Sequence, residues 1–398
     1  MNILLLCNKS PYPPREGGPI AMNAIVTGLL RAGHSVKILA INTNKYFVER
    51  DKIPQDYLAK TKFETAYTDL SIKPLDAFLN LFTTKSYHVE RFINKELDLK
   101  LTRILEEEQF DVVQLESLFV APYINTIRKH SSARIVLRAH NIEYLIWERI
   151  AGNCKNPVKK LYLRHLYRTL RKFEMETLEN VDGVAAITHQ DAAFFAATDT
   201  KTPVIGIPFG VLPEEYSLLD VECESPSLFH LGSMNWVPNQ EGISWFLEKV
   251  WPEIYRIYPD LKFYLAGRMM PDWLIKAGHP NVEVVGEVES AAEFMQSKMA
   301  MIVPLFSGSG IRIKIIEGMA LERTVISTTI GAEGIAYEKG RDILIADTEE
   351  EYIKAVCKCV DDPSYCETIG KNARKLIAES HNNDSIIKNL TGFYEKIT

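Results

Sequence analysis

The apolar positions in the first 41 residues follow the order strand, helix, strand. Residues 2–7 and 35–41 are apolar runs of strand length. Between them, apolar residues and glycine recur at intervals of three and four: Ala21, Ala24, Ile25, Gly28 and Leu29. This spacing predicts an amphipathic helix that ends at Gly33. A strand, a helix and a strand in this order form a βαβ unit, which predicts a parallel sheet.

The same order returns in the second half of the chain. An apolar strand at 228–232 is followed by a loop, an apolar helical stripe and a second strand at 261–266. Asn239 is expected to cap the helix, and the acidic stretch 214–227 is expected to be a linker. The doubled pattern predicts an α/β protein of two Rossmann-like domains facing each other across a cleft, where ligands commonly bind.

Composition narrows the function. The 398 residues carry a net charge of −6, which argues against general nucleic-acid binding. No apolar run reaches the roughly 20 residues that span a bilayer, and the start of the chain reads as a buried strand rather than a signal peptide. Six cysteines without a paired C-x-x-C motif suit a reducing cytoplasm and imply no metal site.

The clearest chemistry lies between residues 299 and 317. A strand at 299–305 ends in a loop with Gly308, Ser309 and Gly310, and a helix is predicted from about Ile311. Glycines allow close approach of the backbone, and a helix start presents unpaired N–H groups, so this order suits a phosphate or diphosphate. Strand, glycine loop and helix also occur where nothing binds, and that alternative stays open for the loop alone.

Three charged residues favour a binding site here. Arg312 and Lys314 would add two cations beside the predicted phosphate. Glu317 lies farther along the helix, where a carboxylate would repel phosphate but could accept hydrogen bonds from sugar hydroxyls. These three residues therefore predict a binding site for a ribose and its diphosphate.

The first half offers weaker candidates. Strands predicted at 110–114 and 133–138 place His140 beyond a strand end, where ligands bind in open α/β sheets. Gly17 and Gly18 lie in the first loop, either as part of a site or as a plain turn. No G-x-G-x-x-G motif is present, which counts against an NAD enzyme.

Two segments of the first half could meet a membrane. Leu75, Phe78, Leu79, Leu81 and Phe82 form an apolar patch that could touch lipid, although packing inside the protein is the favoured interpretation. The basic helix predicted within 155–172 could lie on anionic lipid or meet a phosphorylated acceptor, but a solvated face is favoured.

Two segments resemble the family-4, group 1 glycosyltransferases of the GT-B fold. Residues 308–317 match residue for residue a variant donor motif of that family, Gly-Ser-Gly-x-Arg-x-Lys-x-x-Glu. In the commoner pattern, Glu-x7-Glu, the first Glu would stand at Ser309 and is absent. Residues 232–239 resemble the variant's Gly-Ser-Met-x-Trp-x-Pro-Asn loop, which lacks the usual Arg and Lys.

This resemblance implies a GT-B protein with an N-terminal acceptor-side domain at 1–207 and a nucleotide-sugar domain at 208–380. A last helix at 381–398 would cross back to the first domain. It further implies a retaining, metal-independent sugar transferase without a bound cofactor, acting on a glycan, polysaccharide or lipid-linked acceptor. The protein would be cytoplasmic, with peripheral contact at the inner membrane face left open.

The resemblance also assigns roles to residues. His140, Arg312 and Lys314 would serve the reaction, with His140 beside the reacting sugar and the two cations on the departing diphosphate. The residues expected to bind the donor are Gly17, Gly18, Gly232, Ser233, Arg268, Gly308, Ser309, Gly310 and Glu317. The sequence does not distinguish UDP from GDP. A nucleotide-sugar epimerase and a catalytically silent nucleotide-sugar-binding subunit remain alternatives.

Overall fold

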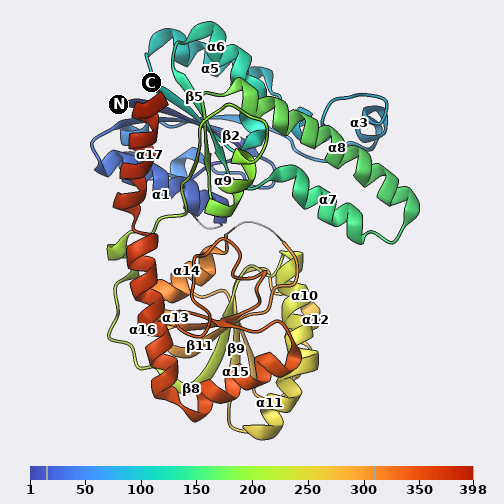
Figure 1. The fold of residues 1–398 in the computed structure, drawn as a ribbon, viewed down its shortest axis with the longest axis vertical. Helices are drawn as coiled ribbons and strands as arrows, with labels where there is room; N and C mark the ends of the chain where they lie inside the picture. The colour runs from blue at the N-terminus through green and yellow to red at the C-terminus, as the bar shows by residue number, and fades with distance from the viewer. Residues whose placement is uncertain (15–16, 309–310, 398) are drawn as a thin grey trace. The chain divides into compact units, whose positions relative to one another are not determined.

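The computed structural model describes residues 1–14, 17–308 and 311–397, so the predicted loop residues Ser309 and Gly310 lie outside the described part. The chain divides into two compact units (Figure 1). Unit 1 comprises Met1–Gly210 and Asn383–Thr398, and unit 2 comprises Val211–Asn382. Each unit is an α/β domain built on a parallel sheet, as the sequence predicts.

Unit 1 contains a seven-stranded parallel sheet in the order β3-β2-β1-β4-β5-β6-β7 among the described residues. Its strands are β1 (Asn2–Cys7), β2 (Ser35–Thr43), β3 (Glu64–Thr68), β4 (Val112–Glu116), β5 (Arg134–Ala139), β6 (Gly183–Ala186) and β7 (Val204–Gly206). The central strands β1, β4 and β5 are buried along almost their whole length because helices cover both faces of the sheet. The predicted strands at 2–7 and 35–41 are confirmed by β1 and β2.

Helices and short helical turns connect these strands. They are α1 (Gly17–Arg31), η1 (Arg50–Lys52), α2 (Gln55–Thr61), α3 (Pro74–Asn80), α4 (Tyr87–Glu90), α5 (Lys95–Glu107), η2 (Leu118–Tyr123), α6 (Ile124–His130), α7 (Glu143–Asn153), α8 (Pro157–Asn180) and α9 (His189–Ala196). The apolar stripe of α1 is buried, as its spacing predicts.

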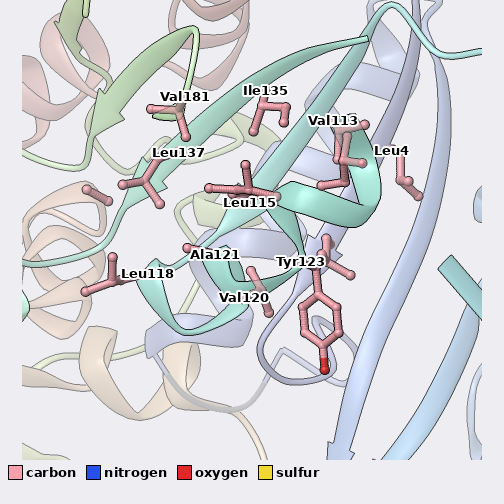
Figure 2. Close-up of a cluster of buried hydrophobic side chains, with 14 of the residues drawn as sticks. Leu4, Val113, Leu115, Leu118, Val120, Ala121, Tyr123, Ile135, Leu137 and Val181 are labelled. Atoms are coloured by element: carbon pink, nitrogen blue, oxygen red, sulfur yellow. The ribbon is translucent and has the colours of Figure 1, made fainter. Parts of the chain in front are cut away.

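The core of unit 1 lies on both faces of its sheet. On one face, side chains of β1, β4 and β5 pack with the apolar residues of η2 (Figure 2). On the other face, α1 packs with α17 (Asn383–Ile397), the last helix of the chain (Figure 1). Asn383 donates a hydrogen bond to the backbone oxygen of Ala24 (2.9 Å), and the Tyr394 hydroxyl donates one to Gln114. The helix α17 is therefore part of this core.

The apolar patch at residues 75–82 does not pack inside unit 1, so the favoured interpretation of this segment is wrong. Phe78 is 57% exposed and Phe82 is 77% exposed, and Leu75, Leu79 and Leu81 are also exposed. The helix α3 instead turns Ala77 and Asn80 toward the protein. An apolar stripe shows that a helix is amphipathic, but it does not show which side of the helix meets the protein.

Unit 2 contains a six-stranded parallel sheet in the order β10-β9-β8-β11-β12-β13 within the described ranges. Its strands are β8 (Glu224–Leu231), β9 (Lys262–Ala266), β10 (Val282–Gly286), β11 (Lys298–Val303), β12 (Thr324–Ser327) and β13 (Leu344–Ile345). The predicted strands at 228–232 and 261–266 are confirmed by β8 and β9, with β8 starting four residues earlier.

The helices of unit 2 flank this sheet. They are η3 (Pro213–Tyr216), α10 (Val237–Trp245), η4 (Phe246–Val250, a π-helical turn), α11 (Trp251–Ile257), α12 (Asp272–Ile275), α13 (Ala291–Gln296), α14 (Ile313–Ala320), α15 (Glu349–Asp361) and α16 (Pro363–Ser380). The predicted apolar stripe from Ile243 to Trp251 is fully buried and runs through α10, η4 and the start of α11.

Candidate functional site

The loops that follow β8 and β9 are held together at the carboxyl edge of the unit 2 sheet. The backbone nitrogen of Gly232 donates to Ala266 (3.1 Å), and that of Met234 donates to Arg268 (2.9 Å). Gly267 has a φ of +137°, and a Cβ there would lie 1.9 Å from the oxygen of Gly232. Glycine is therefore needed for the two loops to approach this closely.

Lys314, in the first turn of α14, reaches this edge. Its Nζ donates a hydrogen bond to Asn239 Oδ1 (2.8 Å) and lies 3.4 Å from Nε2 of His230. A Cβ on Gly232 would come within 3.0 Å of all three side chains. The β8 loop, α10 and α14 thus meet at the Lys314 ammonium.

Asn239 does not cap α10, and that prediction is wrong. The N-cap position is occupied by Trp236, and Asn239 lies in the first turn of the helix. Its side chain donates to the backbone oxygen of Ser233 (2.8 Å) while accepting from Lys314. This buried amide therefore fixes both the β8 loop and the lysine.

Burial controls the protonation of Lys314 and His230. Burial, and to a smaller extent the charge of Arg312, lower the pKa of Lys314 to about 7. Burial and then the nearby lysine hold the pKa of His230 well below its ordinary range. His230 Nδ1 lies 2.8 Å from the carbonyl of Ile302, so Nδ1 carries the proton and Nε2 is an acceptor that faces Lys314.

Arg312 lies next to the glycine loop. It is only 6% exposed, and its guanidinium lies over the Trp236 ring, 5.2 Å from the ring centroid. A Cβ on Gly308, whose φ is +105°, would lie 3.0 Å from Arg312 Nη2 and from the indole of Trp236. The backbone of Gly308, which has no side chain, therefore lies against the Arg312 guanidinium, and that guanidinium stacks on Trp236 at the start of α14.

Glu317 and Arg268 lie beyond the group formed by Lys314, Asn239 and His230. Glu317 follows Lys314 by three residues in α14, and its Oε1 accepts a hydrogen bond from the Tyr216 hydroxyl (3.0 Å). The side chain of Arg268 forms an exposed ion pair with Glu287 (3.3 Å). Ser233 donates to Asn235 (2.9 Å). The structure thus gathers Gly232, Gly308, Arg312 and Lys314, with Glu317 one turn along the helix.

In unit 1, His140 follows β5 and lies at the carboxyl edge of that sheet. Its Nε2 lies 2.7 Å from Oε2 of Glu116, a fully buried residue at the end of the adjacent strand β4. Gln114 also donates to Glu116 (2.5 Å), and Arg138 lies 3.9 Å away. Burial raises the pKa of Glu116, but His140 and Arg138 outweigh burial and lower it below its ordinary value. The carboxylate thus orients the imidazole and leaves Nδ1 available.

Gly17 and Gly18 begin α1, beside the loop that carries His140. A Cβ on Gly18 would lie 2.7 Å from Cε of Lys9. Lys9 in turn lowers the pKa of Glu143, at the start of α7, although burial raises that pKa to about 7 overall. The first loop of the sheet and the loop after β5 are therefore neighbours within unit 1.

The sequence reasoning missed four residues that complete these groups. Glu116, His230 and Trp236 were not proposed, and Asn239 was given a capping role. Glu116 and His230 each lie at or near the carboxyl end of a predicted strand, which is the available signal. Within the described ranges, no three His, Cys, Asp or Glu side chains gather where they could hold a metal ion.

The two domains on parallel sheets have the GT-B fold of glycosyltransferases. The solved structures that resemble the chain have this architecture over its full length. Sucrose-phosphate synthase from Thermosynechococcus elongatus has a TM-score of 0.74 and 15% identity, covering 100% of this chain and 99% of that chain. HepE from Anabaena, in complex with UDP-glucose, has a TM-score of 0.65 and 11% identity, covering 100% of both chains.

The sequence comparisons point to a particular family. Residues 225–362 match the family model described as glycosyl transferases group 1. This match contains every described donor-site candidate of unit 2. A curated relative, an uncharacterized 44.6 kDa protein in the cps region of Klebsiella pneumoniae, is 22% identical over 403 residues and is aligned over 98% of each chain.

Proposed function

We propose that this protein is a retaining, metal-independent glycosyltransferase that moves a sugar from a nucleoside-diphosphate sugar to a glycan, polysaccharide or lipid-linked acceptor. The observation that carries the proposal is the packing of Gly308, Arg312 and Lys314 at the start of α14. The family match over residues 225–362 and the UDP-glucose complex of HepE support the donor class. The cps-region relative is consistent with polysaccharide synthesis.

The two cations would act on the leaving group. As the bond to the transferred sugar breaks, negative charge grows on the diphosphate, and donors that are already in place stabilise it without reorganising. Lys314 is held by Asn239 and faces the lone pair of His230, so two neutral side chains position its ammonium. A bound diphosphate would favour the charged form of Lys314 and so offset the cost of burying it.

The remaining groups would bind the ribose and the acceptor. Glu317 can accept hydrogen bonds from two vicinal hydroxyls, and Tyr216 orients its carboxylate. His140, oriented by Glu116, would border the reacting sugar and could exchange a proton with a sugar hydroxyl through Nδ1. The Gly17 and Gly18 loop would border the same sugar. Exclusion of water would protect the donor from hydrolysis.

A panel of UDP-, GDP- and ADP-sugars tests the activity. Slow release of free nucleotide, accelerated by a glycan or lipid-linked acceptor, is expected of a transferase. Isomerised sugar without nucleotide release would instead identify an epimerase, and binding without turnover would identify a silent subunit. NMR of the product's anomeric proton reads the stereochemistry, and activity that survives EDTA supports the absence of a metal.

Charge variants test the donor site. Arg312→Glu should abolish binding of the nucleotide sugar, whereas Lys339→Glu, an exposed change of similar charge in unit 2, should leave it intact. Arg312→Met keeps an unbranched side chain beside Trp236 and controls for lost packing. Full affinity in a folded Arg312→Glu protein would remove this residue from the site.

A further inference from the structure

The helix α3 presents its large apolar side chains to solvent. Leu75, Phe78, Leu79 and Phe82 follow the i, i+3, i+4, i+7 spacing of one helical face that continues into the next turn, and all four are exposed. Phe78 and Phe82 contact each other edge to face, with ring centroids 5.6 Å apart. A soluble helix ordinarily turns such a stripe inward, so this exposed stripe indicates a surface that something else covers.

The N-terminal half of α8 lies beside α3. His165 Nε2 lies 3.1 Å from the backbone oxygen of Asn80, at the end of α3. Ala77 packs against the cluster that contains Leu163 and Leu166 of α8. Figure 1 shows α3 next to α8, which projects with α7 from the sheet of unit 1. Two more large apolar residues of α8 are exposed: Val158 and Leu161, at 78% and 69%.

The same part of α8 is strongly basic. Between Cys154 and Phe173 the chain has no acidic residue. It carries the cations Lys155, Lys159, Lys160, Arg164, Arg168, Arg171 and Lys172. Lys155, Lys159, Arg164 and Arg168 are exposed, and none of the four forms an ion pair with a described residue. A chain with a net charge of −6 thus concentrates positive charge beside its exposed apolar stripe.

We propose that this face of unit 1, the docking face, binds the surface of an anionic phospholipid bilayer. It consists of the apolar residues Leu75, Phe78, Leu79, Phe82, Val158 and Leu161 and the cations Arg164 and Arg168, which follow Leu161 by three and seven residues on one side of α8. The apolar side chains enter the boundary between headgroups and acyl chains, and the cations contact lipid phosphates. No helix among the described residues is long and apolar enough to cross a bilayer, so the contact is one of a surface.

The positive charge of the docking face favours an anionic bilayer over a second copy of the chain as its partner. In a symmetric dimer built on this face, the same cations of both copies would meet, because a two-fold interface pairs a patch with itself. Such like-charge contacts oppose association. An anionic bilayer offers both an apolar layer for α3 and negative charge for α8. This inference is independent of the transferase reaction and stands without it.

Vesicle co-sedimentation tests the proposal with the whole chain. The protein should sediment with vesicles of phosphatidylcholine and phosphatidylglycerol, but weakly with phosphatidylcholine alone, and high salt should release it. Arg164→Gln with Arg168→Gln should weaken binding about 25-fold, since each cation near an anionic surface contributes about fivefold. The matched control, Lys129→Gln with Lys388→Gln, removes two exposed cations of α6 and α17 and should bind as the unaltered chain does.

The apolar contribution needs its own pair of variants. Phe78→Ser with Phe82→Ser should reduce binding more than tenfold. Leu99→Ser with Ile275→Ser changes exposed apolar residues on α5 and α12 and should have no effect. Absence of binding to anionic vesicles, or unchanged binding in both test variants, would overturn the proposal. A lipid-free dimer that dissociates in the Phe78 and Phe82 variant would also overturn it and assign the face to a second copy.

Discussion

Raising the pH should weaken nucleotide-sugar binding, because Lys314 must be protonated to hold a diphosphate. Burial lowers the pKa of this lysine to about 7 in the free protein. A bound diphosphate favours the charged form and moves the pKa back toward its ordinary value of 10.5. The bound state therefore carries more protons than the free state between these two values, and affinity must fall as the pH rises through that window.

The magnitude follows from the pKa. At about pH 6 Lys314 is mostly charged before the ligand arrives, and binding involves little proton uptake. At about pH 9 roughly one molecule in 100 is protonated, so binding includes a protonation cost of about 2.7 kcal/mol. We therefore expect the dissociation constant to rise about 100-fold between these two pH values.

Isothermal titration calorimetry with UDP-glucose, or with whichever nucleotide sugar of the panel binds, measures this change. A nucleotide sugar is preferable to free UDP, because its diphosphate is esterified at both ends and keeps a constant charge over this range. Repeating the titration in buffers of different ionisation enthalpy gives the proton uptake, which should approach one near pH 9. Lys314→Arg should bind with little pH dependence, since arginine stays charged.

A flat affinity profile from pH 6 to 9 in the unaltered protein would refute this reasoning. The same holds for an equally steep profile in Lys314→Arg, because another group would then be titrating. Loss of binding in Lys314→Met, with an unchanged unfolding temperature, separates lost contact with the ligand from lost structure.

Three further changes have defined outcomes. Glu317→Ala should weaken nucleotide-sugar affinity about tenfold without altering thermal unfolding, and unchanged affinity would refute its ribose role. Burial raises the pKa of Glu143 to about 7, so the folded state keeps a proton that the unfolded chain releases, and stability should fall from about pH 5 to pH 8. Glu143→Gln should make the unfolding temperature fall less steeply over that range, while Glu174, whose pKa burial and then Glu143 raise to about 8, keeps part of the dependence. An unaltered profile would contradict this. Gly242→Ala would place a Cβ 1.7 Å from the oxygen of Pro304 and should cost at least about 2 kcal/mol in urea unfolding, whereas Gly392→Ala meets open space and should not destabilise.

The sequence predicts the parts of the fold that depend on local periodicity. The strands at 2–7 and 35–41 and the buried stripe of α1 follow from spacing alone. The strand, glycine loop and helix around residue 308 follow for the same reason, although α14 starts at Ile313, two residues later than predicted. In each case a run of apolar residues or their spacing decides the structure within one element.

The contacts between elements could not be predicted in the same way. The pairing of His140 with Glu116 depends on β4 lying next to β5, and strand order is not a local property. Asparagine is a residue type that often caps helices, but the side-chain oxygen of Asn239 accepts a hydrogen bond from Lys314, 75 residues away in the sequence. The apolar side chains of α3 were expected to be buried but are exposed, because the spacing of apolar residues does not determine which side of a helix is covered.

The position of α17 has a consequence for biosynthesis. Its buried residues Ile386, Ile387, Leu390, Phe393 and Tyr394 complete a core whose other buried members lie between residues 3 and 207. Unit 2 is one uninterrupted segment, whereas unit 1 is closed by residues that the ribosome adds after the whole of unit 2. We therefore expect a nascent chain to hold an unfinished N-terminal sheet while the later segment matures. Loss of the final turns should expose the first sheet to aggregation and proteolysis while sparing the second.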